Sequence, residues 1–241
     1  MARLWLLLCG VLWICRGSEP PPGHMLPLGS HMEPQLVPRI TTVPKPREFH
    51  DKYVESSTPV ILEGILNSTR LLKTWGDDQY LRERFGGEEV NVEHKKKENR
   101  SETGFLTNMA DYLDRYEGED IYMVSPLTPA MQREWLLPQL LLCGGFTQNL
   151  IFSYAWFSNG GTKSVLHTDA FDNLHCLVSG VKEFVMIEPS YIDIVGPEHK
   201  TQGFYNIDVD KVDLLSHPGL VSVPWHRAVV WPGDCLFLPH L

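Results

Sequence analysis

The sequence predicts a mainly β domain that is preceded by helices, in a barrel or sandwich arrangement. The 241 residues are 43% hydrophobic, 21% charged and include seven Trp, a composition typical of a globular chain with a filled core. After residue 150, helical periodicity gives way to short β-type runs separated by tight turn sequences. Many short strands joined by tight turns indicate a barrel or a sandwich.

The first 17 residues have the layout of a secretory signal peptide. Arg3 is followed by an apolar run, Leu4–Cys15, which is too short to span a bilayer, and no other apolar run is long enough to do so. The alternative is a buried N-terminal helix. Sequons at Asn67 and Asn99 are compatible with passage through the secretory pathway. We therefore expect the protein in the endoplasmic reticulum lumen or outside the cell.

Residues 18–48 form a proline-rich stretch, in which residues 18–46 hold eight of the 18 prolines. This composition predicts a linker or an extended arm laid on the domain. The domain itself is expected over residues 49–241, with a helical part at 49–150 and a β part at 151–241.

The helical part shows alternating helix and strand signals. Pro59–Leu62 and Glu88–Glu93 are predicted strands, and Gln79–Phe85 is a predicted helix that ends at two glycines. Apolar residues between Met109 and Tyr116 recur at helical spacing, which predicts an amphipathic helix. Thr128-Pro129 predicts the start of a third helix near Trp135, with a cap followed by proline.

The β part is a series of short runs separated by turn sequences. The turn Ser179-Gly180 predicts a hairpin between the third and fourth runs. A long polar excursion over residues 197–225 interrupts the series. The β-type runs are Ile151–Phe157, Ser164–His167, Leu174–Val178, Lys182–Ile187, Ala228–Val230 and Cys235–Leu238.

Charge and cysteine content narrow the function classes. Lys and Arg total 21 against 30 Asp and Glu, a formal net charge of −9, which disfavours nucleic-acid binding. Three cysteines follow the signal peptide, Cys143, Cys176 and Cys235, and their spacing resembles neither a disulfide framework nor a zinc site. We expect them to be small buried residues, with one pair among them as the alternative.

Two features of the β part carry chemistry. His167 and Asp169 lie two residues apart, so an extended chain points both to one face, where they offer a divalent metal two of the three ligands of a facial triad. Lys182 alternates with Glu183 on a strand whose two faces are both largely apolar, so one of them points toward a core. A buried lysine without an anion is costly, which suggests a carboxylate ligand; the alternative is a lysine that reaches out to water.

The ordered motifs of this region resemble the JmjC/cupin-like Fe(II)- and 2-oxoglutarate-dependent oxygenases, particularly the small hydroxylase-type members. The resemblance extends from about Phe49 to the end of the chain and implies a double-stranded β-helix, or jelly roll. The motifs are Tyr154-Ala155-Trp156-Phe157-Ser158, Gly160-Gly161-Thr162, His167-Thr168-Asp169, Asn173-Leu174-His175, Ser179-Gly180-Val181-Lys182 and Pro232-Gly233-Asp234-Cys235-Leu236-Phe237-Leu238-Pro239.

The resemblance also implies a site and an activity. It implies Fe(II), with 2-oxoglutarate as cosubstrate and O2 as oxidant, in an enzyme that hydroxylates a protein side chain. Histone demethylation carries less weight, because a signal peptide directs the chain away from chromatin. The implied iron ligands are His167 and Asp169. The implied cosubstrate contacts are Lys182 for the distal carboxylate, with Ser164, Asn173 and Tyr122 beside it, and Trp156 is implied to line the site. His175 is expected only as a strand residue that faces the barrel.

The sequence departs from this pattern at the third iron ligand. The family's histidine falls about five residues beyond the position of Pro239, past Leu241, and neither His226 nor His240 matches it. The closing strands of the barrel are missing for the same reason. Two expectations follow: a shortened form of an active oxygenase, which we favour, or a non-catalytic lumenal binding module. The sequence predicts no oligomeric state.

Overall fold

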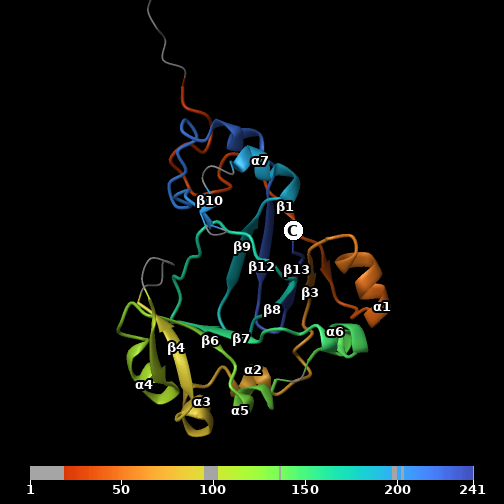
Figure 1. Ribbon diagram of the computed structural model, residues 1–241, viewed down its shortest axis with the longest axis vertical. Coiled ribbons are helices and arrows are strands. Elements are labelled where there is room, and N and C mark those ends of the chain that lie inside the picture. The colour runs from red at the N-terminus through yellow and green to blue at the C-terminus, as the bar shows by residue number, and fades with distance from the viewer. Residues whose placement is uncertain (1–18, 95–102, 136, 197–199, 202–203, 241) are drawn as a thin grey trace, which may run out of the picture.

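The computed structural model describes residues 19–94, 103–135, 137–196, 200–201 and 204–240, and the expected signal peptide lies outside them. In Figure 1 the molecule is elongated, with the N-terminal arm and α7 at the upper end, two sheets in the middle, and a third sheet with helices at the lower end. None of the described helices combines the length and the apolar character that crossing a bilayer requires.

Two sheets form the middle of the molecule. The first has the order β1-β12-β9, and the second has the order β2-β3-β13-β8. The strands of the first are β1 (Gln35–Leu36), β12 (His226–Val230) and β9 (Lys182–Met186). The strands of the second are β2 (Arg39–Ile40), β3 (Val60–Leu62), β13 (Cys235–Leu238) and β8 (Asn173–Cys176).

Strand β13 shows how the second sheet separates two cores. Leu236 is fully buried in one cluster together with Phe184 of the first sheet, so this face of the strand looks toward that sheet. The next residue, Phe237, lies on the opposite face of the strand and packs against Phe49, with ring centroids 5.1 Å apart. Alternation along a strand places successive side chains on opposite faces, and both faces of β13 are apolar because both are covered.

A third sheet, with the order β5-β4-β6-β7, lies at the lower end and carries three helices (Figure 1). Side chains cap each helix: Asp77 accepts from the amide of Gln79 at 2.9 Å, Asn108 caps the second helix, and Thr128 caps the third ahead of Pro129. The predicted helices and the predicted cap are therefore confirmed. These elements are β5 (Phe105–Asn108), β4 (Glu89–Glu93), β6 (Tyr122–Pro126), β7 (Tyr154–Phe157), α3 (Asp78–Phe85), α4 (Met109–Arg115) and α5 (Pro129–Gln132).

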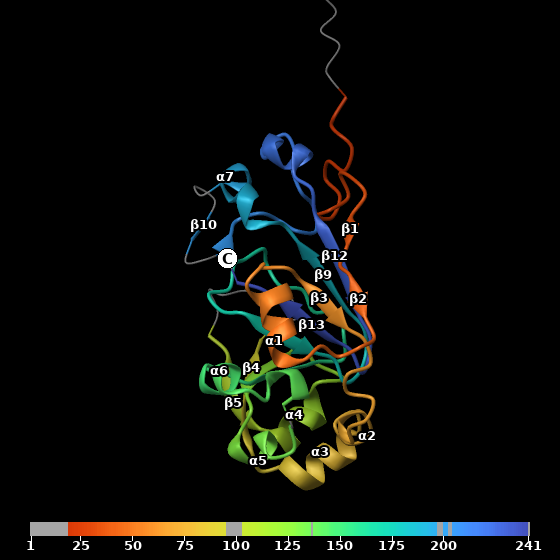
Figure 2. The ribbon, with the colours of Figure 1, turned by 90° about the vertical axis from the view of Figure 1, so that its right-hand side faces the viewer.

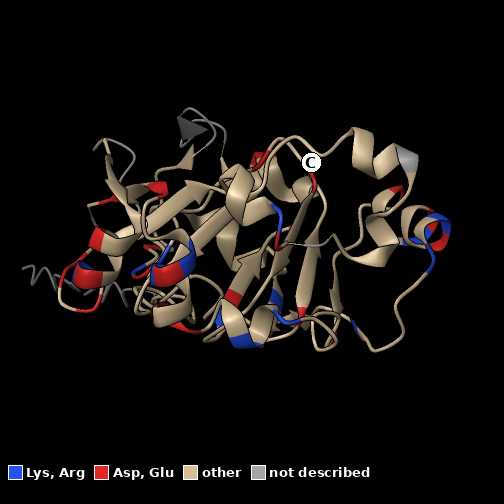
Figure 3. Ribbon diagram, turned by 90° about the horizontal axis from the view of Figure 1, so that it is seen from below, with Lys and Arg blue, Asp and Glu red and all other residues tan. Residues whose placement is uncertain are grey.

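Short helices and two short strands complete the described chain. Figure 3 shows acidic and basic residues mixed along the outer helices, whereas most of the central strands carry neither. These remaining elements are α1 (Pro46–Phe49), the π-helix η1 (His50–Val54), α2 (Leu71–Thr74), η2 (Gln139–Leu141), α6 (Gly144–Gln148), η3 (Pro189–Tyr191), α7 (Ile192–Val195), β10 (Lys200–Thr201), β11 (Phe204–Tyr205) and η5 (Pro218–Ser222).

The proline-rich stretch is laid along the domain as an arm, which is one of the two alternatives that its composition left open. Strand β1 pairs in parallel with β12, and β2 pairs in parallel with β3, as the orange segments of Figure 2 show. Trp225 Nε1 donates to the carbonyl of Met32 at 2.8 Å. Gly29, at φ +93°, lies so close to the Trp225 ring that a Cβ atom would stand 2.9 Å from it. The arm therefore closes the edges of two sheets.

Three sequence predictions for the β part were wrong. The Ser179-Gly180 turn does not make a hairpin, because β8 pairs with β13 while β9 pairs with β12. The turn instead carries the chain from one sheet to the other, and the pairing partners of β8 and β9 come later in the chain. The run 164–167 is no regular strand and forms one isolated bridge, between His167 and Phe204. The polar excursion at 197–225 contributes a hydrophobic cluster of its own, which includes Tyr205 and Leu220.

The cysteines resolve to the pair that the sequence left as an alternative. Cys176 on β8 and Cys235 on β13 occupy directly opposite register positions and form a disulfide. Cys143 has a free thiol. The bond joins strands that are 59 residues apart in the chain, next to the positions that face the interior between the two sheets.

Candidate functional site

An open cleft of about 3170 Å³ lies where the three sheets approach one another. Sites for small ligands usually enclose about 300–1,000 Å³, so this is an open groove, and the polar groups along it define where a ligand binds. Among the described residues, β7, β8 and β9 each have a paired strand on one side only, which accounts for the open side. All residues predicted from the sequence line this cleft: Tyr122, Trp156, Ser164, His167, Asp169, Asn173 and Lys182.

His167 and Asp169 meet on one wall of the cleft. His167 Nε2 lies 3.7 Å from Asp169 Oδ1, and the side chains are 25% and 61% exposed. The bridge to Phe204 fixes the backbone of His167, and its Nδ1 lies 2.7 Å from the carbonyl of Val165. A proton on Nδ1, donated to that carbonyl, presents the lone pair of Nε2 toward Asp169.

The spacing of this pair suits a divalent metal. Nitrogen and oxygen ligands bind such ions at about 2.1 Å, so two donors on one ion lie at most about 4.2 Å apart. The observed 3.7 Å is within that limit. An imidazole held by a carbonyl on its other nitrogen, together with a carboxylate, therefore fits the first two ligands of a facial triad.

Lys182 is the member of its pair that points inward. On β9 it shares a face with Phe184 and Met186, which pack into the core between the sheets. Glu183 lies on the outer face, where it accepts from Arg227 Nε at 2.7 Å. The Lys182 ammonium lies 5.9 Å from the centroid of the Phe184 ring. The choice that alternation left open between Lys182 and Glu183 is thereby settled in favour of an inward lysine.

The other predicted residues differ in their surroundings. Asn173 is half-buried on β8, on the same strand face as His175. Tyr122 on β6 is buried, Ser164 is exposed, and Trp156 on β7 is 44% exposed. The ring of Trp156 lies 5.8 Å from that of His175. Aromatic and polar groups from three sheets thus border one groove.

His175 is the residue to which sequence reasoning assigned no role. It faces the interior, as expected, but burial together with the nearby positive charge of Lys182 lowers the pKa of its imidazole from 6.5 to about 4. Its Nε2 is buried and has no hydrogen-bond partner. The signal available in the sequence was its place two residues after Asn173, which puts both on one strand face.

We expect His175 to make stability depend on pH. Between about pH 6.5 and pH 4 the unfolded chain protonates this imidazole and the folded chain does not, so the unfolded state binds more protons and stability falls as pH is lowered. From pH 7 to pH 5 the loss due to His175 is about 2 kcal/mol. Urea unfolding at both pH values measures it, and His175→Phe should lose less free energy over this interval by that amount. Equal losses in both proteins would contradict the prediction.

Two further histidines that line the cleft are each paired with a carboxylate that also lines it. His226 Nε2 lies 3.1 Å from Glu188 Oε1, and His240 Nδ1 lies 2.8 Å from Asp172 Oδ1. In the described part of the chain, the one group of three His, Cys, Asp or Glu ligands within 4.8 Å of one another is His50, Asp51 and Glu55.

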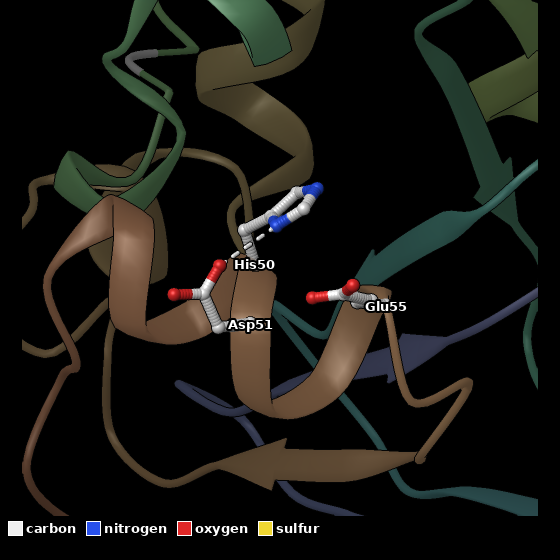
Figure 4. Close-up of side chains that lie close together, drawn as sticks. All are labelled: His50, Asp51 and Glu55. Carbon is white, nitrogen blue, oxygen red and sulfur yellow. Dashed lines mark hydrogen bonds and ion pairs between the residues drawn. The ribbon is translucent and has the colours of Figure 1, made fainter.

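The group of His50, Asp51 and Glu55 lies on η1 and its end, as Figure 4 shows. All three residues are exposed. Asp51 already accepts from His50 Nδ1 at 3.1 Å and from Arg47 Nε at 3.3 Å. Such a cluster is typical of a solvated polar surface. It lies on η1 and its end, far along the chain from His167 and Asp169, and shares no residue with that pair.

Facing sheets around a cleft with a His-x-Asp pair define a cupin-like jelly-roll protein. A family model described as "Cupin-like domain" matches residues 46–241, so the chain belongs to the JmjC/cupin-like family. That membership supports an oxygenase-like function of the JmjC type.

The chain is similar to several curated proteins. It is 28% identical over 218 residues to "Lysine-specific demethylase 8" of Danio rerio, covering 84% of this chain and 53% of that protein. It is 25% identical over 220 residues to "Jumonji C domain-containing protein 5" of Drosophila melanogaster, covering 84% and 54%. It is 26% identical over 235 residues to "tRNA wybutosine-synthesizing protein 4" of Neurospora crassa, covering 84% and 19%. The chain therefore spans about half the length, or less, of these relatives.

Proposed function

We propose that this protein is an Fe(II)- and 2-oxoglutarate-dependent oxygenase of the secretory pathway that hydroxylates a protein side chain. The observation that carries the proposal is the placement of His167 Nε2 and Asp169 Oδ1 3.7 Å apart in a cleft that Lys182 also lines. A metal-binding pair and an inward ammonium in one groove suit a ligand that has both a chelating end and a carboxylate end. Proteins of the JmjC family generally use that combination of iron and 2-oxoglutarate.

Each residue of the chain has a defined task in this scheme. His167 and Asp169 would hold the iron, and the Val165 carbonyl keeps the imidazole in the tautomer that presents Nε2. Lys182, whose ammonium lies 5.9 Å from the centroid of the Phe184 ring, would bind and orient the far carboxylate of the cosubstrate. When bound, the iron and its cosubstrate supply the oxidising chemistry, and the protein supplies binding and orientation.

A protein substrate fits the cleft better than a nucleic acid does. Phe152 and Phe171 are 60% and 51% exposed beside the cleft, with ring centroids 6.0 Å apart, and such exposed aromatic groups are typical of peptide-contacting surfaces. The net charge of −9 disfavours a polyanion such as tRNA.

The disulfide and the sequon at Asn67 support passage through the secretory pathway. Disulfides persist in oxidising compartments and are rare in the cytosol, which agrees with the signal-peptide pattern of the first 17 residues. Asn67 is exposed and follows β3, where a glycan can extend into solvent. Asn99 lies outside the described residues.

We expect the chain to carry an N-linked glycan at Asn67 when it is expressed in eukaryotic cells. Digestion with peptide N-glycosidase F should then increase its mobility on a denaturing gel. In Asn67→Gln the difference in mobility between the undigested and the digested chain should be smaller by the contribution of one glycan. Ser68→Ala, which preserves the Asn and the Thr of the sequon, serves as the matched control and should keep the glycan. An undigestible chain in which neither substitution changes mobility would count against entry into the secretory pathway.

Metal and cosubstrate binding test the catalytic part of the proposal. We expect Mn(II), added anaerobically as a stand-in for Fe(II), to bind the chain and to raise its affinity for 2-oxoglutarate. His167→Ala and Asp169→Ala should each weaken metal binding by at least about tenfold to 100-fold, because the loss of an outer partner of a ligand alone has that effect. Asp51→Ala, in the exposed group near α1, is the control and should leave the affinity unchanged.

The same titration separates the oxygenase from a second candidate, a non-catalytic binding module. That candidate is favoured by one observation: in the described residues no third His, Cys, Asp or Glu joins His167 and Asp169 within 4.8 Å. Metal binding that neither substitution weakens, together with no succinate formed from 2-oxoglutarate in the presence of Fe(II) and air, would support the module. A longer form with a histidine beyond Leu241 should be tested beside this chain, and failure of both forms would reject the oxygenase.

A further inference from the structure

His175 occupies an interior position that an apolar residue would fill without cost. On β8 its neighbours Leu174 and Cys176 point to the other face of the sheet and pack into the core around Phe49. The residue opposite His175 on β13 is Leu236, which is fully buried in the core between the two sheets. His175 therefore brings a polar group, as Asn173 does two positions earlier, to a face of β8 whose opposite residue on β13 is apolar.

Three sheets contribute to the surroundings of the imidazole. Its ring meets Phe184 of β9 edge to face, with centroids 5.1 Å apart, and Trp156 of β7 at 5.8 Å. Both neighbours are aromatic and leave the imidazole nitrogens unbonded on those sides. Nε2 is buried and has no hydrogen-bond partner, and His175 is one of the residues that line the cleft. A buried polar atom without a partner costs stability, so such an atom at the wall of a groove points to a ligand that completes it.

The charge next to His175 indicates which ligand. The Lys182 ammonium lies against the same Phe184 ring, and its positive charge lowers the pKa of the imidazole together with burial. At neutral pH the imidazole is therefore uncharged, and its Nε2 can carry a proton and donate it. An ammonium and a neutral N–H donor beside one aromatic ring are complementary to a carboxylate, which accepts from both.

We propose that His175 Nε2 donates a hydrogen bond to the carboxylate of the acid ligand that Lys182 binds, so that the two residues form a two-point anchor. The inference rests on the proposed use of 2-oxoglutarate and assigns to its binding a residue beyond those that the family resemblance implies. His175 then acts as a specificity determinant, because a ligand without a carboxylate at this position leaves Nε2 unpaired.

The test measures binding of 2-oxoglutarate, and separately of succinate, to the full chain by NMR titration to millimolar concentrations. His175→Phe keeps an aromatic ring and removes the donor, and we expect it to weaken binding about tenfold, the effect of one lost hydrogen bond. His175→Gln keeps an N–H donor and should recover part of the loss. His226→Phe is the matched control, because Glu188 already pairs with that imidazole, and it should bind like the wild type.

A second measurement follows ligand binding in the wild-type protein itself and uses the variant only to assign a resonance. In the wild type, the resonance of the His175 Nε2 proton, assigned by its absence in His175→Phe, should shift downfield and exchange more slowly with water as ligand is added. Binding that His175→Phe leaves unchanged, with no shift of this resonance, would overturn the inference and leave the oxygenase proposal intact. A wild type that binds neither acid would overturn both.

Discussion

Removing the Cys176–Cys235 disulfide should lower the free energy of unfolding by about 4 kcal/mol. The bond closes a loop of 59 residues, and the chain-entropy relation for a loop of that length gives a stabilisation of about this size. Alanine at both positions avoids a buried hydroxyl, because Cys235 is fully buried and Cys176 lies in the same core. Urea unfolding of the oxidised wild type and of the double variant measures the difference.

Cys143→Ala is the matched control for this experiment. That thiol is free and half-buried, so we expect a change within about 0.5 kcal/mol. Reductant should destabilise the wild type and leave the double variant unaffected. If the wild type and the double variant unfold at the same urea concentration with and without reductant, the two cysteines are not bonded in the protein. The support that the disulfide gives to a secretory location would then be lost.

The disulfide also bears on the site, because it fixes the two strands that carry the inner wall of the cleft. Cys176 directly follows His175 on β8. Cys235 directly precedes Leu236, which is the residue of β13 opposite His175. A bond at this register prevents β8 from sliding along β13, and a slip of one residue would turn Asn173 and His175 to the opposite core. The double variant should therefore also bind 2-oxoglutarate more weakly than the wild type.

Local patterns predicted the elements well where the chemistry that defines them is local. The caps at Asp77, Asn108 and Thr128 depend on a side chain and an amide two or three residues away, and helices begin there. Strand β13 extends over Cys235–Leu238, as its apolar run predicts. Alternation along β9 also placed Lys182 and Phe184 on one face, because the period of a strand does not depend on its partners.

Pairing between distant strands could not be predicted in the same way. The turn at Ser179-Gly180 is a good hairpin signal, but β8 and β9 find their partners about 50 residues later, in β13 and β12. Burial of both faces of β13 against two separate cores outweighs the local preference for a hairpin. The N-terminal arm could not be placed from the sequence for the same reason. Its prolines are compatible with a free linker or with an extended arm. Pairing with the edges of β12 and β3, which lie later in the chain, makes it an arm.

Lys182→Met should reduce the affinity for 2-oxoglutarate by about 100-fold and leave the fold intact. The substitution removes the positive charge that faces a carboxylate in a partly desolvated cleft, and the loss of one partner of such a pair costs about 2–5 kcal/mol of binding. The methionine side chain fills similar space beside Phe184. Because methionine covers the same face of β9, the free energy of unfolding should change little, although binding falls. Calorimetric titration and urea unfolding give the two quantities.

A loss of 2-oxoglutarate affinity without a loss of stability distinguishes an anchor from a structural lysine. If Lys182 served mainly to hold β9 in place, Lys182→Met would lower stability and affinity together. Lys211→Met, on an exposed loop, controls for the change in net charge and should alter neither quantity. A Lys182→Met protein that is as stable as the wild type and still binds 2-oxoglutarate normally would show that the ammonium has no part in ligand binding. Lys182 would then have no role in ligand binding, and both proposals about the cleft would lose their common anchor.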